Sequence, residues 1–407
     1  MSISPNADSQ ALRLLARLAC AMFFTFMTIG LPLPVVPLYV GHDLGFGNVL
    51  VGISVGIQFL ATILTRSYAG RTADAEGAKG VMLRGMFFCG CSGVALILCA
   101  VLPLPDGLRL AVLIAGRLIL GFGESQVVVG MLGWGMGTVG PARASTVLAW
   151  TGMAMYGSMA AAAPIGYRLY RQGGLVFVGL AAIAAPLIAA ALAFRVPHVA
   201  PHPGQRQSFL KTVGLIWQAG LGVLLQGVGF AGIGTFVSLD FAAHHWSGTG
   251  VAMTCFGGAF VLVRIFFGRA PDRFGGGQVA MASFVVEIIG QSLLYLAPSA
   301  PVALLGAAAT GAGCSMIFPS LGVEIVKRVP AQIRSTALGG FAAFQDAAYG
   351  LTGPLTGIFA TAYGYPSVFA VGAVCGLGGL FVTGAIVRGA LGWGSATEER
   401  LLFVNKK

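Results

Sequence analysis

The chain has 407 residues, of which 57% are hydrophobic and only 9% are charged, and its mean hydropathy is +0.86. A soluble domain carries about 25% charged residues, so this composition excludes a water-soluble protein and predicts an all-α membrane protein with many spanning helices. The net charge of +11 could suggest a nucleic-acid partner. The basic residues lie in alternate loops between apolar segments, however, so no nucleic-acid binding is expected.

Apolar segments long enough to cross a membrane follow one another along the chain. A spanning helix needs about 20 residues. The first segment is too long for a signal peptide and lacks a cleavage site, so we expect it to be retained as a helix. Twelve windows fit, at roughly 15–40, 49–69, 81–102, 109–131, 144–166, 175–194, 212–240, 249–267, 279–298, 302–326, 336–359 and 367–388.

The windows predict two bundles of six helices each. The first bundle covers 1–194 and the second, with a short tail, covers 212–407. Between them, residues 195–211 are rich in Pro, His and basic side chains, which is typical of a solvated linker. The other connections are short and leave no room for a soluble domain such as an ATPase module.

The basic residues predict how the helices are oriented in the membrane. Twenty of the 24 Lys and Arg residues fall on one side of the twelve windows, three fall on the other side, and Arg117 lies within a window. Cytoplasmic loops carry the excess of Lys and Arg. Both termini and the linker are therefore expected in the cytoplasm.

A short charged motif occurs twice, 198 residues apart, after the second and the eighth windows. Both copies read R-x-x-x-G-R-x-x-D and lie on the basic side. The same motif at matching positions in the two halves indicates an internal duplication. The first copy contains Arg66, Gly70, Arg71 and Asp74, and the second contains Arg264, Gly268, Arg269 and Asp272, followed by Arg273.

The seven cysteines fall in apolar windows and form no C-x-x-C pair. All five histidines lie in loops or at the ends of windows. We therefore expect neither a disulfide framework nor a metal site.

Several motifs resemble those of the major facilitator superfamily over nearly the whole chain. Gly70-x-x-x-Asp74-x-x-Gly77-x-Lys79 is similar to the family's signature between helices 2 and 3. Arg117-x-x-x-Gly121-x-Gly123 is similar to the helix 4 motif that the family associates with proton coupling. The resemblance implies the major facilitator fold, with twelve transmembrane helices in two six-helix halves.

Other stretches resemble narrower groups within that superfamily. Gly350-x-x-Gly353-Pro354-x-x-Gly357 is similar to the Gly-Pro motif of drug/proton antiporters, and Pro164 with Gly166 resembles a degenerate copy. Residues 28–37 and 117–125 look closest to the YhhS/YfcJ-like group of bacterial permeases, which is similar to predicted arabinose-efflux-type carriers. The resemblance implies a multi-pass protein of the bacterial inner membrane.

The duplicated motif is expected to form a pair of gates. In the fold that the resemblance implies, Asp74 lies beside the N-terminus of helix 11 and Asp272 beside that of helix 5. An anion at a helix N-terminus is stabilised by about 0.3–1 kcal/mol. Such contacts between the halves would latch the state that is open to the outside.

Four ionisable residues lie well inside the windows, where charge is costly and often functional. Arg117 and Glu124 are seven residues apart, which places them two turns apart on one helix face. Burial opposes ionisation of Glu124 and a nearby cation favours it, a balance that suits a proton carrier. Asp346 is either a second proton or substrate site or a buried polar clasp to another helix, and Glu287 is expected to pack between helices.

Substrate contacts are harder to predict from the sequence. Gln226 lies in the seventh window, which the resemblance places beside the central cavity. Phe26 and Phe230 suggest a partly apolar solute, although phenylalanine in membrane helices usually serves packing. These three residues are the predicted substrate contacts.

These observations predict a secondary transporter that exports a small sugar-like or drug-like solute in exchange for protons. Proton-coupled import of a sugar or an organic acid, and a non-transporting receptor on the same fold, remain as alternatives. An enzyme is not expected, because no converged catalytic set lies within the windows. No cofactor is expected beyond the proton gradient, and the expected partners are the solute, protons and lipid around a monomer.

Overall fold

A computed structural model describes residues 5–140, 143–199, 209–329 and 334–389, and these residues form helices joined by short turns, with no strand. The all-α prediction is therefore confirmed. The helices are α1 (Pro5–Gly30), α2 (Val35–Leu38), the π-helical turn η1 (Tyr39–Asp43), α3 (Asn48–Glu76), α4 (Ala78–Val101), α5 (Asp106–Val139), α6 (Ala144–Phe194), α7 (Phe209–Ala243), α8 (Val251–Phe267), α9 (Ala270–Phe274), α10 (Gly276–Tyr295), α11 (Ala300–Arg328), α12 (Arg334–Tyr363) and α13 (Pro366–Val387).

Nine of the described helical segments are long and apolar enough to cross a membrane. One of them, α6, contains two of the predicted windows, because its helical backbone is interrupted at Gly173 and Gly174. Counting the two arms of α6 separately and adding α8 and α12, each of the twelve predicted windows corresponds to a described helix. The first span is built from α1, α2 and η1 in succession.

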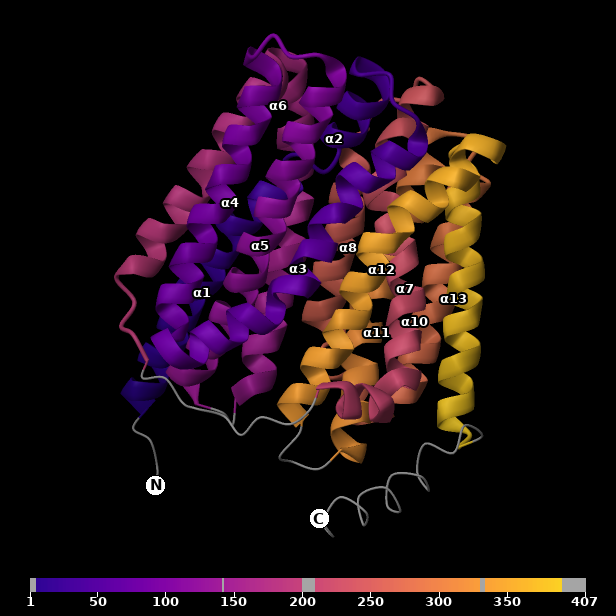
Figure 1. Cartoon of the computed structure of the whole chain (residues 1–407). Coiled ribbons are helices and arrows are strands. Elements are labelled where there is room, and N and C mark those ends of the chain that lie inside the picture. The colour runs from indigo at the N-terminus through magenta and orange to yellow at the C-terminus, as the bar shows by residue number, and fades with distance from the viewer. Residues whose placement is uncertain (1–4, 141–142, 200–208, 330–333, 390–407) are drawn as a thin grey trace.

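The helices run up and down between two faces of the molecule (Figure 1). We call the face at which α1 begins and α13 ends the basic face, because it holds Arg71, Lys79, Arg269, Arg273 and Arg388. The other face, which holds Arg109, Arg168 and Arg171, is called the opposite face. The described basic residues thus separate as the positive-inside pattern requires.

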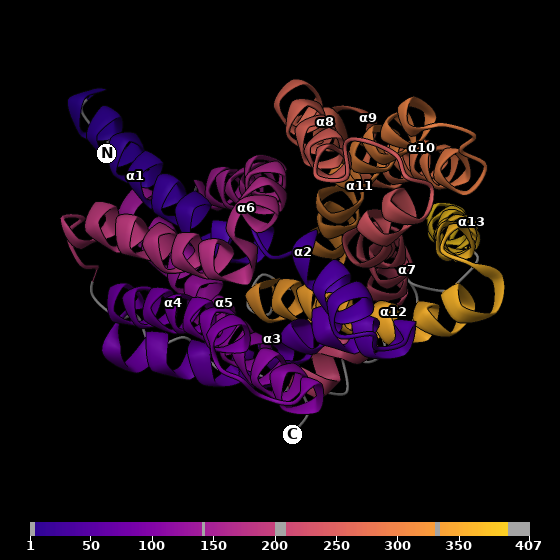
Figure 2. The same ribbon diagram turned by 90° about the horizontal axis from the view of Figure 1, so that it is seen from above.

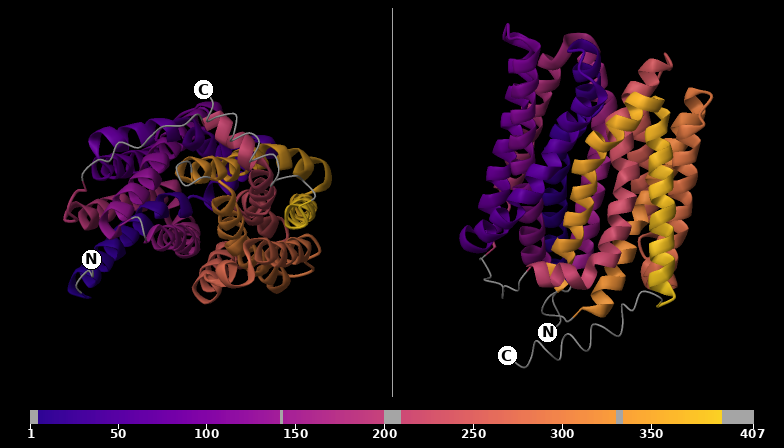
Figure 3. Two further views of the ribbon diagram at one scale, coloured as in Figure 1. Left: turned by 90° about the horizontal axis from the view of Figure 1, so that it is seen from below. Right: turned by 45° about the vertical axis from the view of Figure 1, so that its right-hand side comes forward.

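Seen from above, α1 and α3–α6 gather on one side and α7–α11 and α13 on the other (Figure 2). The most extensive contacts between these groups are those of α12 with α3 and of α6 with α8, and α7 adds smaller contacts with α2 and α3. The view from below shows the same arrangement (Figure 3), and the side view in Figure 1 shows α13 at the edge. The boundaries predicted at 194 and 212 stay predictions, because much of the linker lies outside the described residues.

Large apolar side chains are exposed around the circumference, as expected of helices that face lipid. Examples are Leu64, Phe87, Phe266 and Phe381, all more than half exposed. Inside, the helices approach closely at small residues. A Cβ added to Gly85 or Gly123, for example, would crowd the facing backbone of α5 or α4.

The duplicated motif ends in the same backbone turn in both halves. Gly77 and Gly275, 198 residues apart, have φ angles of +94° and +92° and connect α3 to α4 and α9 to α10. Side chains other than glycine rarely adopt this conformation. The second copy differs just before the turn, because Pro271 occupies the position of Ala73 and lacks the N–H that would continue α8.

We predict that Gly77→Ala lowers the thermal stability of the purified protein, because the added Cβ disfavours positive φ by about 1–2 kcal/mol. Melting is followed in detergent by intrinsic fluorescence. Gly80→Ala is the matched control, since Gly80 lies in α4 with open space around it, and alanine favours a helix. Equal melting temperatures for the two variants would contradict the assignment of strain to Gly77.

Candidate functional site

An ion pair joins α3 to α12 inside the bundle. Arg66 Nη2 lies 2.6 Å from Asp346 Oδ2, and the two side chains are 22% and 14% exposed. Arg66 is ten residues before the end of α3, about 15 Å along the helix from the basic face. The first arginine of the motif thus lies apart from Asp74 and meets one of the predicted proton-binding carboxylates.

Glu124 lies between α5 and α3, close to this ion pair. Its Oε2 accepts hydrogen bonds from Gln58 Nε2 at 2.7 Å and from Thr62 Oγ1 at 3.3 Å. The side chain is only 5% exposed, and no described cation lies within 4 Å of it. Glu124 is therefore a buried carboxyl group held by neutral donors, within electrostatic range of Arg66 and Asp346.

The helices meet closely at this point because Gly121 has no side chain. A Cβ on Gly121 would overlap the carbonyl oxygen of Gln58. The hydroxyl of Thr62 also lies 3.1 Å from the carbonyl oxygen of Gly121, a second acceptor for the single proton that it donates. The glycine of the helix 4 motif thus brings α5 close enough to α3 for Glu124 to reach its two donors.

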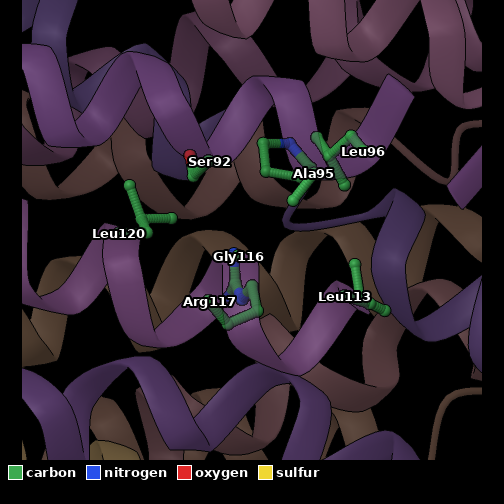
Figure 4. A pocket seen from close by; sticks show the side chains of 8 residues that line it. Ser92, Ala95, Leu96, Leu113, Gly116, Arg117 and Leu120 are labelled. Carbon is green, nitrogen blue, oxygen red and sulfur yellow. The ribbon is translucent and has the colours of Figure 1, made fainter. Parts of the chain in front are cut away.

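Arg117 also faces α3 but does not pair with Glu124. Its Nε donates to the carbonyl of Ser54 at 3.1 Å and its Nη2 to that of Val55 at 3.4 Å. It borders a cavity of about 10 Å³ between α4 and α5, too small for a solute (Figure 4). Arg117 and Glu124 share a helix face, as predicted, and Arg117 tethers α5 to the backbone of α3.

An aromatic cluster occupies the junction of the two helix groups. The hydroxyls of Tyr156 on α6 and Tyr349 on α12 lie 2.8 Å apart. Tyr156 stacks on Phe260 with ring centroids 3.8 Å apart, and Phe230 contacts both tyrosines. We call Tyr156, Phe230, Phe256, Phe260 and Tyr349 the aromatic cluster.

The predicted substrate contacts fall in different surroundings. Phe230 belongs to the aromatic cluster, whereas Phe26 is fully buried in the apolar core. Gln226 is buried and accepts a hydrogen bond from Gln345 Nε2 of α12 at 3.3 Å. The sequence reasoning did not assign a role to the two tyrosines. For Tyr349 the available signal was its four-residue spacing from Gln345, whereas Tyr156 has only Gly152 and Ala160 at that spacing.

Arg264, which corresponds to Arg66 in the second copy of the motif, is also drawn into the bundle. Its Nη2 donates to the carbonyl of Ser315 at 2.6 Å, and its guanidinium lies 5.1 Å from the centre of the Phe260 ring. In the described part of the chain no carboxylate lies within 4 Å of Arg264. The two motif arginines therefore differ in charge compensation.

The remaining predicted gate residues lie at the basic face. Arg71, Asp74, Arg269, Asp272 and Arg273 are exposed and form no ion pair with another described residue. The guanidinium of Arg273 lies 5.2 Å from the centre of the Phe274 ring, and Gly70 and Gly268 precede the exposed arginines. The side chains at the starts of α12 and α6 lie outside the described residues, so the latching contacts stay predictions.

Toward the opposite face, the two helix groups are pressed together at glycines. We call Gly52 and Gly56 of α3 with Gly350 and Gly353 of α12 the glycine seam. A Cβ on Gly52 would overlap the backbone of Gly353, and one on Gly56 the carbonyl of Gly350. On α6 and α8, Thr254 Oγ1 donates to the carbonyl of Ala160 at 2.8 Å. The halves are thus closed toward the opposite face.

The surroundings of Glu287 in the second half correspond to those of Glu124 in the first half. It is fully buried on α10 and accepts a hydrogen bond from Cys314 Sγ of α11 at 3.5 Å. In the first half, Cys89 of α4 lies against Gly123 of α5, the residue next to Glu124. The thiol and the carboxyl group have exchanged helices between the halves, and Glu287 lies between packed helices, as predicted.

Comparisons with known proteins agree on the family. The family model described as Major Facilitator Superfamily matches residues 18–239 and 219–392. An uncharacterized MFS-type transporter of Salmonella typhimurium is 46% identical over 374 residues, covering 92% of this chain and 96% of the relative. These relatives and the fold indicate a membrane transporter.

Two crystal structures have a similar fold at low sequence identity. The nucleoside transporter NupG has a TM-score of 0.72 at 18% identity, with 91% of this chain and 99% of that chain covered. A D-xylose-proton symporter has a TM-score of 0.74 at 16% identity, with 91% and 96% covered. At this identity the likeness concerns the fold alone.

We predict that the Arg66–Asp346 pair contributes more than an exposed pair does. Arg66→Gln and Asp346→Asn each leave a buried charge uncompensated and should lower the melting temperature. The double variant should lose less stability than the two single variants lose together. The difference, which is the coupling energy, should be about 0.5–3 kcal/mol. The control pair is Arg84 with Glu76, which is exposed at 3.3 Å; equal coupling in the two pairs would refute the prediction.

The glycine seam generates a second prediction. Gly353→Leu should force α3 and α12 apart, because even a Cβ there would press on the backbone of Gly52. The readout is the rate at which a water-soluble maleimide labels Val51→Cys, a fully buried position beside Gly52, in a background without other cysteines. Labelling should be several-fold faster with Gly353→Leu and unchanged with the control Gly339→Leu, whose surroundings are open. A rate that Gly353→Leu leaves unaltered would contradict the seam.

Proposed function

The chain belongs to the Major Facilitator Superfamily, and we propose that it is a secondary active transporter that exports a small organic solute in exchange for protons. Transport proceeds by alternating access, in which the two halves rock about a central site. The proton gradient supplies the energy, without a bound cofactor or a chemical reaction on the solute. The working unit is a monomer in the bacterial inner membrane, with both termini in the cytoplasm, as the basic face supports.

The observation that carries the proposal of proton coupling is the site of Glu124. A carboxyl group with only the neutral donors Gln58 and Thr62 can take up a proton without leaving an unpaired charge in the membrane. The neighbouring Arg66–Asp346 pair is already balanced. Glu124 is therefore proposed as the proton carrier, and Asp346 as the group that links protonation to the contact between the halves.

The link follows from where the ion pair lies. Arg66 is on α3 and Asp346 on α12, so protonation of Asp346 would remove the ionic part of a contact between the halves. Arg66 would then have Glu124 as an alternative anion within electrostatic range. Uptake of a proton by Glu124 or Asp346 would thus alter the contact that holds α3 and α12 together. Arg71, Asp74, Asp272 and Arg273 are proposed to latch the basic face when the seam opens.

Export is proposed from the Gly-Pro motif, which resembles that of drug/proton antiporters. Import by proton symport is the second candidate. It is favoured by the likeness in fold to a protein described as a D-xylose-proton symporter. Counterflow of the solute in vesicles of known orientation distinguishes the two directions.

We predict that Glu124→Gln uncouples transport from protons. The solute used is the one that most raises the melting temperature of the purified protein in a screen of sugars and small organic compounds. In proteoliposomes, an imposed pH gradient should accelerate wild-type flux. The variant should retain solute counterflow but show no acceleration by the gradient, because glutamine cannot carry a proton.

The matched control is Glu76→Gln, which removes an exposed carboxylate from the end of the same helix that faces Glu124. It should keep the acceleration by the gradient. Proton coupling would be refuted by wild-type flux that ignores the gradient. The role of Glu124 would be refuted by a variant that the gradient accelerates as strongly as the wild type.

A further inference from the structure

We infer that Arg264 binds the carboxylate of an apolar, preferably aromatic, organic acid, so that the transported solute is an organic anion. This inference rests on the proposed transport function and names the substrate class of the same central region. It begins from a charge without a counterion inside the membrane part of the protein.

Arg264 is the less compensated of the two motif arginines. Its described contacts are the hydrogen bond from Nη2 to the carbonyl of Ser315 and the face of the Phe260 ring. Its Nε is buried and has no hydrogen-bond partner, as is also true of the Nε of Arg66, so the two arginines differ in the carboxylate that only Arg66 has. A carbonyl and a ring orient a guanidinium but do not neutralise it, and an uncompensated charge in this setting is costly.

The internal repeat shows which partner is missing. Asp346, the partner of Arg66, lies eight residues before Pro354 on α12. The residue eight positions before the corresponding Pro164 on α6 is Tyr156. The second half therefore keeps the arginine, whereas the first half carries a neutral phenol at the position that matches Asp346. An anion supplied by a ligand would restore at Arg264 the balance that Asp346 provides at Arg66.

Arg264 lies at the contact between the two halves. The Nη1 atom lies 3.8 Å from where a Cβ of Gly152 would be. Gly152 belongs to α6 of the first half and Arg264 to α8 of the second. At this level the facing helix thus presents no side chain to the guanidinium, and Arg264 lies where the two halves meet, along the path of a solute that passes between them by alternating access.

The surroundings specify the rest of the ligand. The aromatic cluster begins at the ring that supports the guanidinium, since Phe260 stacks on Tyr156 and Phe230 lies against Tyr156. Aromatic side chains supply apolar contact area and favour other rings. The hydroxyls of Tyr156 and Tyr349 offer hydrogen bonds across the halves. A carboxylate joined to an apolar ring matches this combination of one cation, aromatic faces and two hydroxyl groups.

The test measures equilibrium binding to the full-length protein by thermal stabilisation in detergent. The probes are benzoate, phenylacetate, salicylate and cinnamate, each compared with its neutral amide. At least one acid should raise the wild-type melting temperature more than its amide does. Arg264→Gln should weaken binding of that acid at least about tenfold, as expected for loss of a charge-assisted hydrogen bond, and should leave the response to the amide unchanged.

Two further variants separate binding from a structural role. Arg264→Lys keeps the charge and should bind the acid more tightly than Arg264→Gln does. Arg269→Gln removes the exposed arginine of the same motif and should bind like the wild type. If Arg264 only tethered α8 to α11 through Ser315, Arg264→Gln would melt lower without ligand but keep the acid-specific response.

That last outcome would overturn the inference, as would a probe set in which no acid stabilises the wild type more than its amide. The measurement uses no pH gradient, so its failure leaves proton coupling through Glu124 untouched. Conversely, a Glu124→Gln variant with normal coupling would refute the proton carrier while leaving an anion site at Arg264 in place.

Discussion

The ion pair between Arg66 and Asp346 is the contact on which the arrangement of the central region depends. It connects two helices from different halves, at a depth where neither charge is stable alone. Each charge therefore stabilises the other, and the ion pair links α3 to α12. The nearby carboxyl group of Glu124 has no such partner and takes its hydrogen bonds from neutral side chains instead. One balanced pair beside one protonatable acid is the simplest arrangement that can couple a proton to a movement of the halves.

Close packing of glycines joins α3 to α12 in addition to the ion pair. Toward the opposite face, α3 and α12 meet backbone to backbone at the glycine seam, because the facing positions on both helices are glycines and no side chain lies between them. In a membrane, where lipid chains are as apolar as the helices, such close approach replaces the hydrophobic effect as the source of helix association. The Gly-Pro motif of α12 is therefore part of the surface that closes the protein toward this face. At the basic face, by contrast, the charged motif residues are exposed.

The internal repeat is most informative where its two copies differ. The backbone turns at Gly77 and Gly275 are the same, which shows how faithfully the geometry repeats. The charges do not repeat, since Arg66 has Asp346 whereas Arg264 faces a helix that carries Tyr156 at the matching position. The buried acids also exchange helices, from Glu124 on α5 to Glu287 on α10. A duplicated scaffold thus holds an asymmetric set of charges, which is compatible with the proton-coupled cycle proposed above.

The sequence by itself determined the helices, their number and the separation of basic residues, because each depends on about 20 consecutive residues and their solvent. It also marked Arg117, Glu124 and Asp346 as unusual, because any ionisable residue within an apolar window is. Only the tertiary structure decided which groups meet. Arg66 and Asp346 are 280 residues apart in the chain, Arg117 binds backbone carbonyls and not Glu124, and the partner of Tyr156 is Tyr349. Hydropathy records where a helix crosses the bilayer, whereas the rotation of that helix and its neighbours are set by packing between side chains far apart in sequence.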